Sequence, residues 1–196
     1  MVEISDLIRK KGSCIIVSGP SGTGKTTICR IVEKKMPGLL YSVSVTSRHP
    51  RAGEKDGEDY FFVDEKRFND MIENDRLIEW AKVYDKYYGT PREFIEKNIE
   101  KCSNIILDID IQGGLNIKKK LPDSVLIFVL PPSIDELRNR LGKRKKDSQA
   151  EIKKRLESVS REIGYVRDYE YIVINSDVEE AVGKIESIIV AAGCRI

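Results

Sequence analysis

The 196-residue sequence has few cysteines and histidines, and they are not spaced as zinc ligands are. It contains a single histidine, His49, and four cysteines, none of which form a C-x-x-C pair. Zinc sites usually need closely spaced Cys and His ligands. Cys14 lies in an apolar run and Cys29 in a helical pattern. We therefore expect both to be buried free thiols of a protein from a reducing compartment.

Long hydrophobic runs and a strong net charge are also missing. No window approaches the roughly 18 consecutive apolar residues of a transmembrane helix, and the N-terminal segment lacks the apolar core of a signal peptide. The 34 Lys and Arg against 32 Asp and Glu leave a net charge of +2. This balance gives no electrostatic reason to expect nucleic acid or a membrane as a partner. The sequence predicts a cytoplasmic protein and leaves its oligomeric state open.

The most specific motif is a complete phosphate-binding loop. Residues 19–26 match G-x-x-x-x-G-K-[ST] and follow directly on the apolar run 14–17. Glycines let successive N–H groups turn toward phosphate oxygens, and the following helix adds the positive end of its dipole. Lys25 is placed to reach the β and γ phosphates, and Thr26 to hold Mg²⁺. The competing interpretation is a plain glycine-rich turn. The residues predicted to bind the triphosphate are Gly19, Pro20, Ser21, Gly22, Thr23, Gly24, Lys25, Thr26 and Thr27.

Short apolar runs alternate with helical periodicity along most of the chain. Such runs are typical of strands buried on both faces, so we expect a three-layer α/β fold with a parallel sheet between helices. A capping box at 133–136 predicts one helix start. Strands are predicted at 13–18, 104–108, 124–130 and 171–174, and helices at 25–36, 111–120, 133–144, 149–168 and 177–192.

Residues 40–101 break this rhythm. Short strands are predicted at 41–45, 60–63 and 77–83, helices near 64–74 and 91–101, and a polar stretch lies at 46–59. A small mixed insertion between the first helix and the strand at 104 predicts a second substrate beside the triphosphate.

Within this insertion the sequence resembles the guanylate kinase family, whose members transfer a phosphoryl group from ATP to GMP. The matching motifs are Ser-Val-Ser-Val-Thr-Ser-Arg-His-Pro-Arg-Ala-Gly-Glu at 42–54, Gly-Glu-Asp-Tyr-Phe-Phe-Val at 57–63, Ile-Glu-Trp-Ala at 78–81, Tyr-Tyr-Gly-Thr at 87–90, Leu-Asp-Ile-Asp-Ile-Gln-Gly at 107–113, Pro-Pro-Ser at 131–133 and Val-Ile-Asn at 173–175. The resemblance covers about residues 12–192.

The resemblance implies a P-loop NTPase fold with a parallel central sheet, a mixed α+β GMP-binding insertion and a helical lid. It implies one domain over residues 1–196. The core would comprise about 1–39, 102–135 and 168–196, the insertion about 40–101 and the lid about 136–167.

For the GMP phosphate, the resemblance implies Arg48, Arg51, Tyr60 and Tyr88 as ligands. A dianion suits guanidinium forks and phenolic hydroxyls. The alternatives are a solvated turn for the two arginines and ordinary core packing for the two tyrosines.

For the guanine base, the resemblance implies Glu79 and Asp110 as acceptors and Ser44 and Thr90 as hydroxyl ligands. A carboxylate that accepts from N1–H and N2–H₂ reads guanine, whereas adenine reverses this pattern. Glu79 could instead be an exposed strand carboxylate. Residues 90–93 read Thr-Pro-Arg-Glu, a capping box, so helix and base compete for the Thr90 hydroxyl.

For catalysis, the resemblance implies arginines in the lid, and Asp108 ends a strand where P-loop enzymes keep the acidic residue that orients Mg²⁺. Asp108 would act with Thr26, directly or through a water. The chain departs from the family pattern after Arg144 and at Ser176. The residues assigned to catalysis are Lys25, Arg51, Arg144 and Arg155, and Arg140 and Asn175 are assigned to ATP.

The predicted activity is Mg²⁺-dependent transfer of the γ-phosphoryl group of ATP to GMP, and also to dGMP, without a phosphoenzyme. Two alternatives remain: a kinase for another nucleoside monophosphate, and a non-catalytic guanylate kinase-like interaction module. Such modules typically lose the phosphate loop or the lid arginines, and this chain keeps both.

Overall fold

A computed structural model describes residues 12–83, 85–143 and 149–195 of the chain. For Lys143 and for residues 149–156 it describes the backbone only. Arg144 therefore lies outside the described residues, and Arg155 is placed by its backbone alone.

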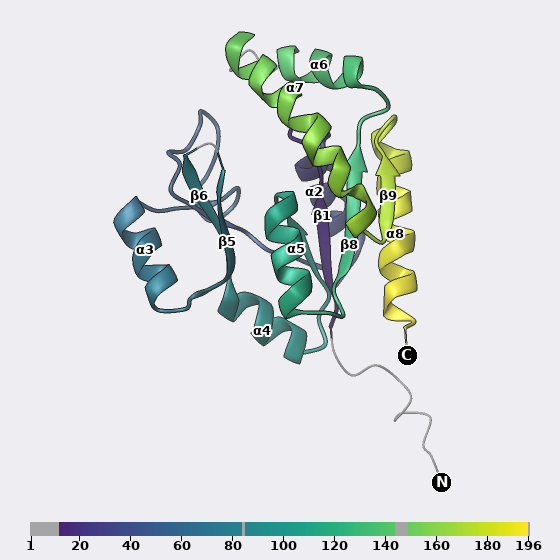
Figure 1. Ribbon diagram of the computed structural model, residues 1–196. Coiled ribbons are helices and arrows are strands. Elements are labelled where there is room, and N and C mark those ends of the chain that lie inside the picture. The colour runs from purple at the N-terminus through teal and green to yellow at the C-terminus, as the bar shows by residue number, and fades with distance from the viewer. Residues whose placement is uncertain (1–11, 84, 144–148, 196) are drawn as a thin grey trace.

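A parallel sheet, the central sheet, has the strand order β2-β7-β1-β8-β9 (Figure 1). All of its pairings are parallel. The residues of β1 and most of those of β7 and β8 are fully buried, as the continuous apolar runs predicted. The strands are β2 (Leu40–Tyr41), β7 (Ile105–Asp108), β1 (Cys14–Ser18), β8 (Val125–Leu130) and β9 (Tyr171–Ile174).

Helices cover both faces of the central sheet. Ile15 and Val17 of β1 belong to the hydrophobic cluster shared with α2 (Lys25–Lys35) and α8 (Val178–Gly193). Cys14 and Ile16, which alternate with them, face the cluster formed with α4 (Arg92–Glu100) and α5 (Ile111–Lys120). The predicted three-layer fold is confirmed, and the helices at 25–36, 111–120 and 177–192 lie within one residue of their predicted bounds.

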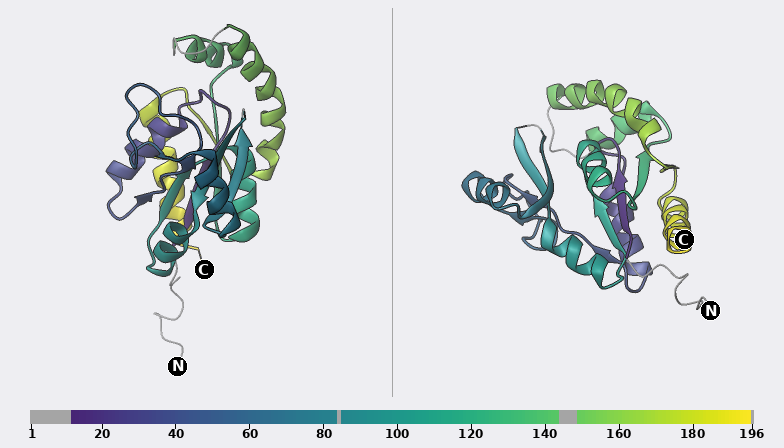
Figure 2. Two further views of the ribbon diagram at one scale, coloured as in Figure 1. Left: turned by 90° about the vertical axis from the view of Figure 1, so that its left-hand side faces the viewer. Right: turned by 60° about the horizontal axis from the view of Figure 1, so that its bottom comes forward.

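A smaller mixed sheet, the second sheet, lies to one side of the central sheet (Figures 1 and 2). Helix α3 (Glu65–Glu73) packs against it through Phe68, which forms a small core with Val45 and Leu77. In the order β4-β3-β6-β5 its strands are β4 (Phe61–Phe62), β3 (Val45–Thr46), β6 (Lys86–Pro91) and β5 (Leu77–Val83).

Two predictions for this region are wrong, and one strand was missed. The predicted strand at 41–45 is two strands in two sheets, since Tyr41 pairs with β7 and Val45 with β4 and β6. Strand β6 was not predicted, because its Gly and Pro are typical of turns. The capping box at 90–93 does not form: Pro91 is the N-cap of α4, with no side-chain cap hydrogen bond.

The predicted lid contains two helices, α6 (Ile134–Lys143) and α7 (Gln149–Gly164), followed by a 3₁₀ turn at Tyr165–Asp168. Leu137 and Leu141 of α6 pack on Val159 of α7. The Ser133 hydroxyl accepts the N–H of Glu136, which confirms the predicted cap. Among the helices that the structure describes, none has the length and apolar character needed to cross a membrane.

Candidate active site

A cavity of about 630 Å³ is lined by both the phosphate loop and the second sheet. Of the residues predicted from the sequence, those that line it are Gly19, Ser21, Gly22, Gly24, Lys25, Thr26, Thr27, Ser44, Arg51, Tyr60, Glu79, Tyr88, Asp108 and Asp110. Six further predicted residues do not line the cavity but are joined by hydrogen bonds to lining residues or to one another: Pro20, Thr23, Arg48, Thr90, Arg140 and Asn175.

The phosphate loop depends on glycine at two close approaches. Gly19 has φ +137°, and a Cβ there would lie 2.3 Å from the carbonyl oxygen of Val129. Gly24 has φ +95° and caps the N-terminus of α2 in the left-handed region. A Cβ on Gly24 would lie 2.5 Å from Nδ2 of Asn175. Only glycine adopts both conformations without strain.

Asn175 and Arg140 support the loop from behind. The Asn175 side chain is 2% exposed, and its Nδ2 donates to the Thr23 carbonyl at 2.7 Å. Arg140 donates to the Asn175 carbonyl at 3.0 Å and pairs with Glu136 at 2.8 Å. The structure thus places Asn175 against the loop and Arg140 against Asn175.

Lys25 and Thr26 begin α2 at the edge of the cavity. Nζ of Lys25 donates to the carbonyls of Gly19 at 2.7 Å and Pro20 at 2.9 Å. The Thr26 hydroxyl donates to the carboxylate of Asp108, the last residue of β7. A hydroxyl and a carboxylate from neighbouring elements therefore meet where the loop ends.

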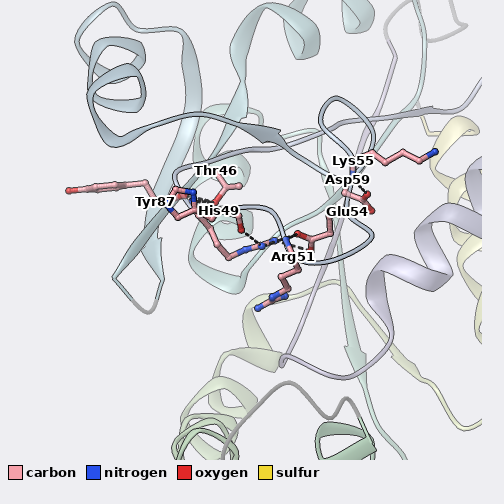
Figure 3. Close-up of polar contacts among 8 residues, drawn as sticks. Thr46, His49, Arg51, Glu54, Lys55, Asp59 and Tyr87 are labelled. Atoms are coloured by element: carbon pink, nitrogen blue, oxygen red, sulfur yellow. Dashed lines mark hydrogen bonds and ion pairs between the residues drawn. The ribbon is translucent and has the colours of Figure 1, made fainter.

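The four residues predicted to bind the GMP phosphate lie together. The rings of Tyr60 and Tyr88 meet edge-on, with centroids 5.9 Å apart, and burial raises the pKa of Tyr60 above its ordinary value. The Arg48 guanidinium lies 5.3 Å from the Tyr60 ring centroid. Arg51 is exposed on the loop that follows and lines the cavity, with its side chain extended (Figure 3).

Glu54 joins the two arginines and was missed by sequence reasoning. Its carboxylate accepts two hydrogen bonds from Arg48, at 2.9 and 3.0 Å, and the N–H of Arg51 at 2.7 Å. Burial alone would raise the pKa of Glu54, but these hydrogen bonds and charges hold it below its ordinary value. The available signal was the regular spacing Arg48-x-x-Arg51-x-x-Glu54.

Glu79 is buried in the cavity wall. Its side chain is 5% exposed, and its Oε1 accepts a 2.7 Å hydrogen bond from the Thr90 hydroxyl. Burial raises the pKa of Glu79 to about 7, with a further contribution from Asp110 that Thr90 and Lys120 oppose. The alternative of an exposed strand carboxylate is wrong, and the Thr90 hydroxyl serves Glu79.

Asp110 faces Glu79 from the N-terminus of α5. Its Oδ1 accepts the N–H of Gly113 at 3.1 Å and so caps the helix. A Cβ on Gly113 would lie 2.8 Å from Oε2 of Glu79 and 3.5 Å from Oδ2 of Asp110. Ser44, 8% exposed, also lines the cavity. The arrangement offers carboxylate oxygens to a ligand that presents N–H groups.

Other lining residues were missed. Arg30 follows Thr26 by one turn of α2, and its guanidinium lies 3.6 Å over the Tyr41 ring. The i, i+4 spacing was the available signal for Arg30. Glu162 and Tyr165 line the cavity from the end of α7 and the turn after it; no sequence motif marks them.

Comparisons with known proteins agree on one family. The family described as guanylate kinase matches residues 11–192. The guanylate kinase of Caldanaerobacter subterraneus subsp. tengcongensis is 54% identical, over 96% of this chain and 92% of that protein. The guanylate kinase of Desulfitobacterium hafniense is 46% identical, over 94% and 92%.

Solved structures extend this similarity. The crystal structure of guanylate kinase from Anaplasma phagocytophilum aligns with a TM-score of 0.82 at 32% identity, covering 96% of this chain and 89% of that one. A shikimate kinase from Bacteroides thetaiotaomicron aligns with a TM-score of 0.52 at 15% identity, over 91% and 98%, and this likeness concerns the fold alone.

Proposed function

Because the chain belongs to the guanylate kinase family, we infer that ATP and GMP meet in the cavity of about 630 Å³, and we propose a role for each predicted residue around it. The chain is an ATP:GMP phosphotransferase, which converts ATP and GMP to ADP and GDP. One observation carries the placement: the phosphate loop and Glu79 line the same cavity.

We propose that residues 19–27 hold the triphosphate. Backbone N–H groups of the loop would bind phosphate oxygens, and Lys25 would exchange its carbonyl contacts with Gly19 and Pro20 for the β and γ phosphates. Asn175 and Arg140 would act on ATP through the loop, since the Thr23 carbonyl held by Asn175 fixes the neighbouring N–H groups.

The oxygen ligands at Thr26 and Asp108 fit Mg²⁺ bound with ATP. The two side chains are already hydrogen bonded to each other at the cavity, and Mg²⁺ prefers a few protein oxygens, several waters and substrate phosphates. Thr26 would bind the ion directly and Asp108 through a water. When bound, the ion would neutralise charge on the β and γ phosphates.

The GMP phosphate would lie against Arg51, Tyr60 and Tyr88, which line the cavity. Arg48 would add its positive charge from behind the tyrosines, at 5.3 Å from the Tyr60 ring. A dianion in a partly buried site needs charge-assisted hydrogen bonds of this kind.

Guanine would bind between Glu79 and Asp110. With Thr90 donating to Oε1, Glu79 would accept from N1–H and N2–H₂ of the base. Ser44 would donate to O6, and Thr90 would act through Glu79. None of these contacts involves the ribose 2′-hydroxyl, so dGMP should also be a substrate.

Transfer would proceed in line, because the GMP phosphate oxygen is already anionic and needs no general base. Lys25 and Arg51, which both line the cavity, would stabilise charge on the transferring group. The sequence resemblance adds Arg144 and Arg155 of the lid to this set. The predicted division into core, insertion and lid, and a cytoplasmic location, remain part of the proposal.

A coupled assay of ADP release tests this assignment with GMP, dGMP, AMP, CMP and UMP as acceptors. GMP should exceed AMP, CMP and UMP in kcat/KM by about 100-fold or more, because none of those bases presents the adjacent N–H and NH₂ donors with which guanine would satisfy the buried carboxylates. A preference for another monophosphate would identify a different kinase. ADP release with none of the five would favour the interaction module.

A further inference from the structure

The Glu54 carboxylate holds the two arginines assigned to the GMP phosphate in one hydrogen-bonded unit. Both of its oxygens accept from the Arg48 guanidinium, at 2.9 and 3.0 Å, in a two-point fork. Oε2 also accepts the backbone N–H of Arg51 at 2.7 Å (Figure 3). One side chain thus fixes the guanidinium of the first arginine and the backbone of the second.

The loop around Glu54 is built to hold this arrangement. The Glu54 N–H donates to the Arg51 carbonyl at 3.0 Å, which closes a turn, and Gly53 supplies a φ of +88°. Nη1 of Arg48 also donates to the His49 carbonyl at 2.7 Å. The loop from Arg48 to Glu54 is therefore closed by side chain and backbone together.

The ion pair is shielded from water on one side by aromatic rings. The Arg48 and Glu54 side chains are 12% and 20% exposed, and the guanidinium lies 5.3 Å from the Tyr60 ring and 5.7 Å from the Phe62 ring. Burial alone would lower the pKa of Arg48, but hydrogen bonds to Glu54 and Tyr88 raise it. Charge-assisted, two-point pairs in such surroundings fix geometry better than exposed pairs do.

We propose that Glu54 is a positioning residue for GMP, which sets Arg48 and the Arg51 backbone in their binding geometry before the phosphate arrives. An arginine without such a partner loses side-chain freedom on binding, and this loss weakens affinity. The inference rests on the proposed roles of Arg48 and Arg51 toward the phosphate.

A competing effect of Glu54 has the opposite sign, so the direction of the change in GMP affinity decides between the two. Glu54 lines the cavity and is negatively charged. A carboxylate beside a phosphate site can repel the incoming dianion and occupy the arginines that would bind it. If this effect dominated, removing the charge would strengthen GMP binding.

Glu54→Gln and Glu54→Ala separate these effects by calorimetry of GMP binding and by steady-state kinetics. Losing hydrogen bonds to charged groups should raise the Kd for GMP about 10-fold in the first variant and about 30-fold in the second. KM for ATP should change less than about twofold. The hydrogen bonds described for residues 48–54 share no residue with those described for the phosphate loop, so the two sites should respond independently. Thermal unfolding checks that each variant is folded.

Glu58→Gln is the matched control. Glu58 lies four residues beyond Glu54, and its carboxylate pairs with Lys55 at 3.3 Å in an exposed ion pair. This variant should leave the Kd for GMP unchanged. Guanosine, which lacks the phosphate, should bind the wild-type chain and Glu54→Gln equally.

The outcomes are distinct. Tighter GMP binding by Glu54→Gln, or an equal loss for GMP and guanosine, would overturn the inference. Arg48→Ala and Arg51→Ala test whether these arginines bind the GMP phosphate at all. If both leave GMP affinity unchanged, the proposed phosphate site itself is wrong. If they weaken GMP binding and Glu54→Gln does not, only the positioning role fails.

Discussion

The two loops proposed to bind phosphate, the phosphate loop and the loop from Arg48 to Glu54, are held in shape in different ways. The phosphate loop is shaped by its backbone, with Gly19, Gly22 and Gly24 at positive φ and its carbonyls held by Lys25 and Asn175. The loop from Arg48 to Glu54 has one backbone turn and depends mainly on side chains, through the Arg48–Glu54 ion pair and the contact of Arg48 with the Tyr60 ring. A substitution that alters backbone freedom should damage the first region most, and one that alters side-chain charge should damage the second.

The two regions also rest on cores of different size. The phosphate loop follows β1, which is buried between two large hydrophobic clusters. The second sheet has a small cluster around Val45, Phe68 and Leu77. Regions with few buried apolar contacts open more readily. We therefore expect hydrogen exchange to be faster in the second sheet than in β1.

Lys25→Ala tests the phosphate loop and should have the largest effect. The ammonium acts on phosphate charge in the transition state, so kcat/KM should fall by roughly 1,000-fold. Its loss removes the hydrogen bonds to the Gly19 and Pro20 carbonyls, but thermal unfolding should change little because the glycines still set the loop conformation. Lys34→Ala, an exposed lysine of the same helix, is the control. Near-normal turnover of Lys25→Ala would refute the assignment of the loop.

Glu79→Gln tests base recognition in the second sheet. An acceptor oxygen becomes an N–H donor that faces a donor of guanine. The transition-state stabilisation calculated from kcat/KM for GMP should therefore fall by roughly 2–4 kcal/mol. IMP lacks the 2-amino group, so its kcat/KM should already be lower than that of GMP in the unmodified enzyme and should fall by a smaller factor in Glu79→Gln. Equal losses for GMP and IMP would mean that Glu79 does not read the 2-amino group.

Gly113→Ala sharpens the same point with an intermediate effect. The new Cβ would lie 2.8 Å from Oε2 of Glu79, so the carboxylate must move. KM for GMP should rise about 10-fold, as expected when one charge-assisted hydrogen bond is lost, with KM for ATP unchanged. Gly183→Ala, in α8 with open space around it, should leave both constants unchanged. An unaffected KM for GMP would show that Glu79 has room to adjust.

The pH dependence of GMP binding should give the smallest effect. The pKa of Glu79, raised by burial to about 7, leaves the free enzyme increasingly protonated as pH falls below 7. GMP bound as proposed needs the ionised carboxylate, so KM for GMP should rise by at most about 10-fold between pH 8 and pH 6. Glu79→Gln cannot titrate, and its profile corrects for ionisation of the GMP phosphate. Parallel profiles for the two proteins would contradict the expectation.

The sequence was most informative where local pattern and tertiary environment agree. The phosphate loop is contiguous, and the strands around it are apolar on both faces, so both could be predicted from the residues alone. Asp108 was placed correctly because a strand end fixes the position of its last residue. These features need no knowledge of distant partners.

Sequence prediction failed, or left alternatives open, where a distant partner decides. The Thr90 hydroxyl has a local use as a helix cap, but β5 and β6 pair so that it lies beside Glu79 and donates to it instead. Residues 41–45 are extended, but the pattern of apolar residues does not show that they divide between two sheets. Glu54 lies in a polar turn whose ion pair with Arg48 forms only in the folded loop.

The proposed base site lies between the two sheets. Asp110 and Gly113 belong to the N-terminal end of α5, which follows strand β7 of the central sheet, whereas Glu79 and Thr90 belong to the second sheet. A guanine base bound as proposed would act as a reversible cross-link between these units. Its binding free energy would then stabilise the contact between the central sheet and the second sheet. The acceptor substrate would in this way reduce the motion of the two units relative to each other.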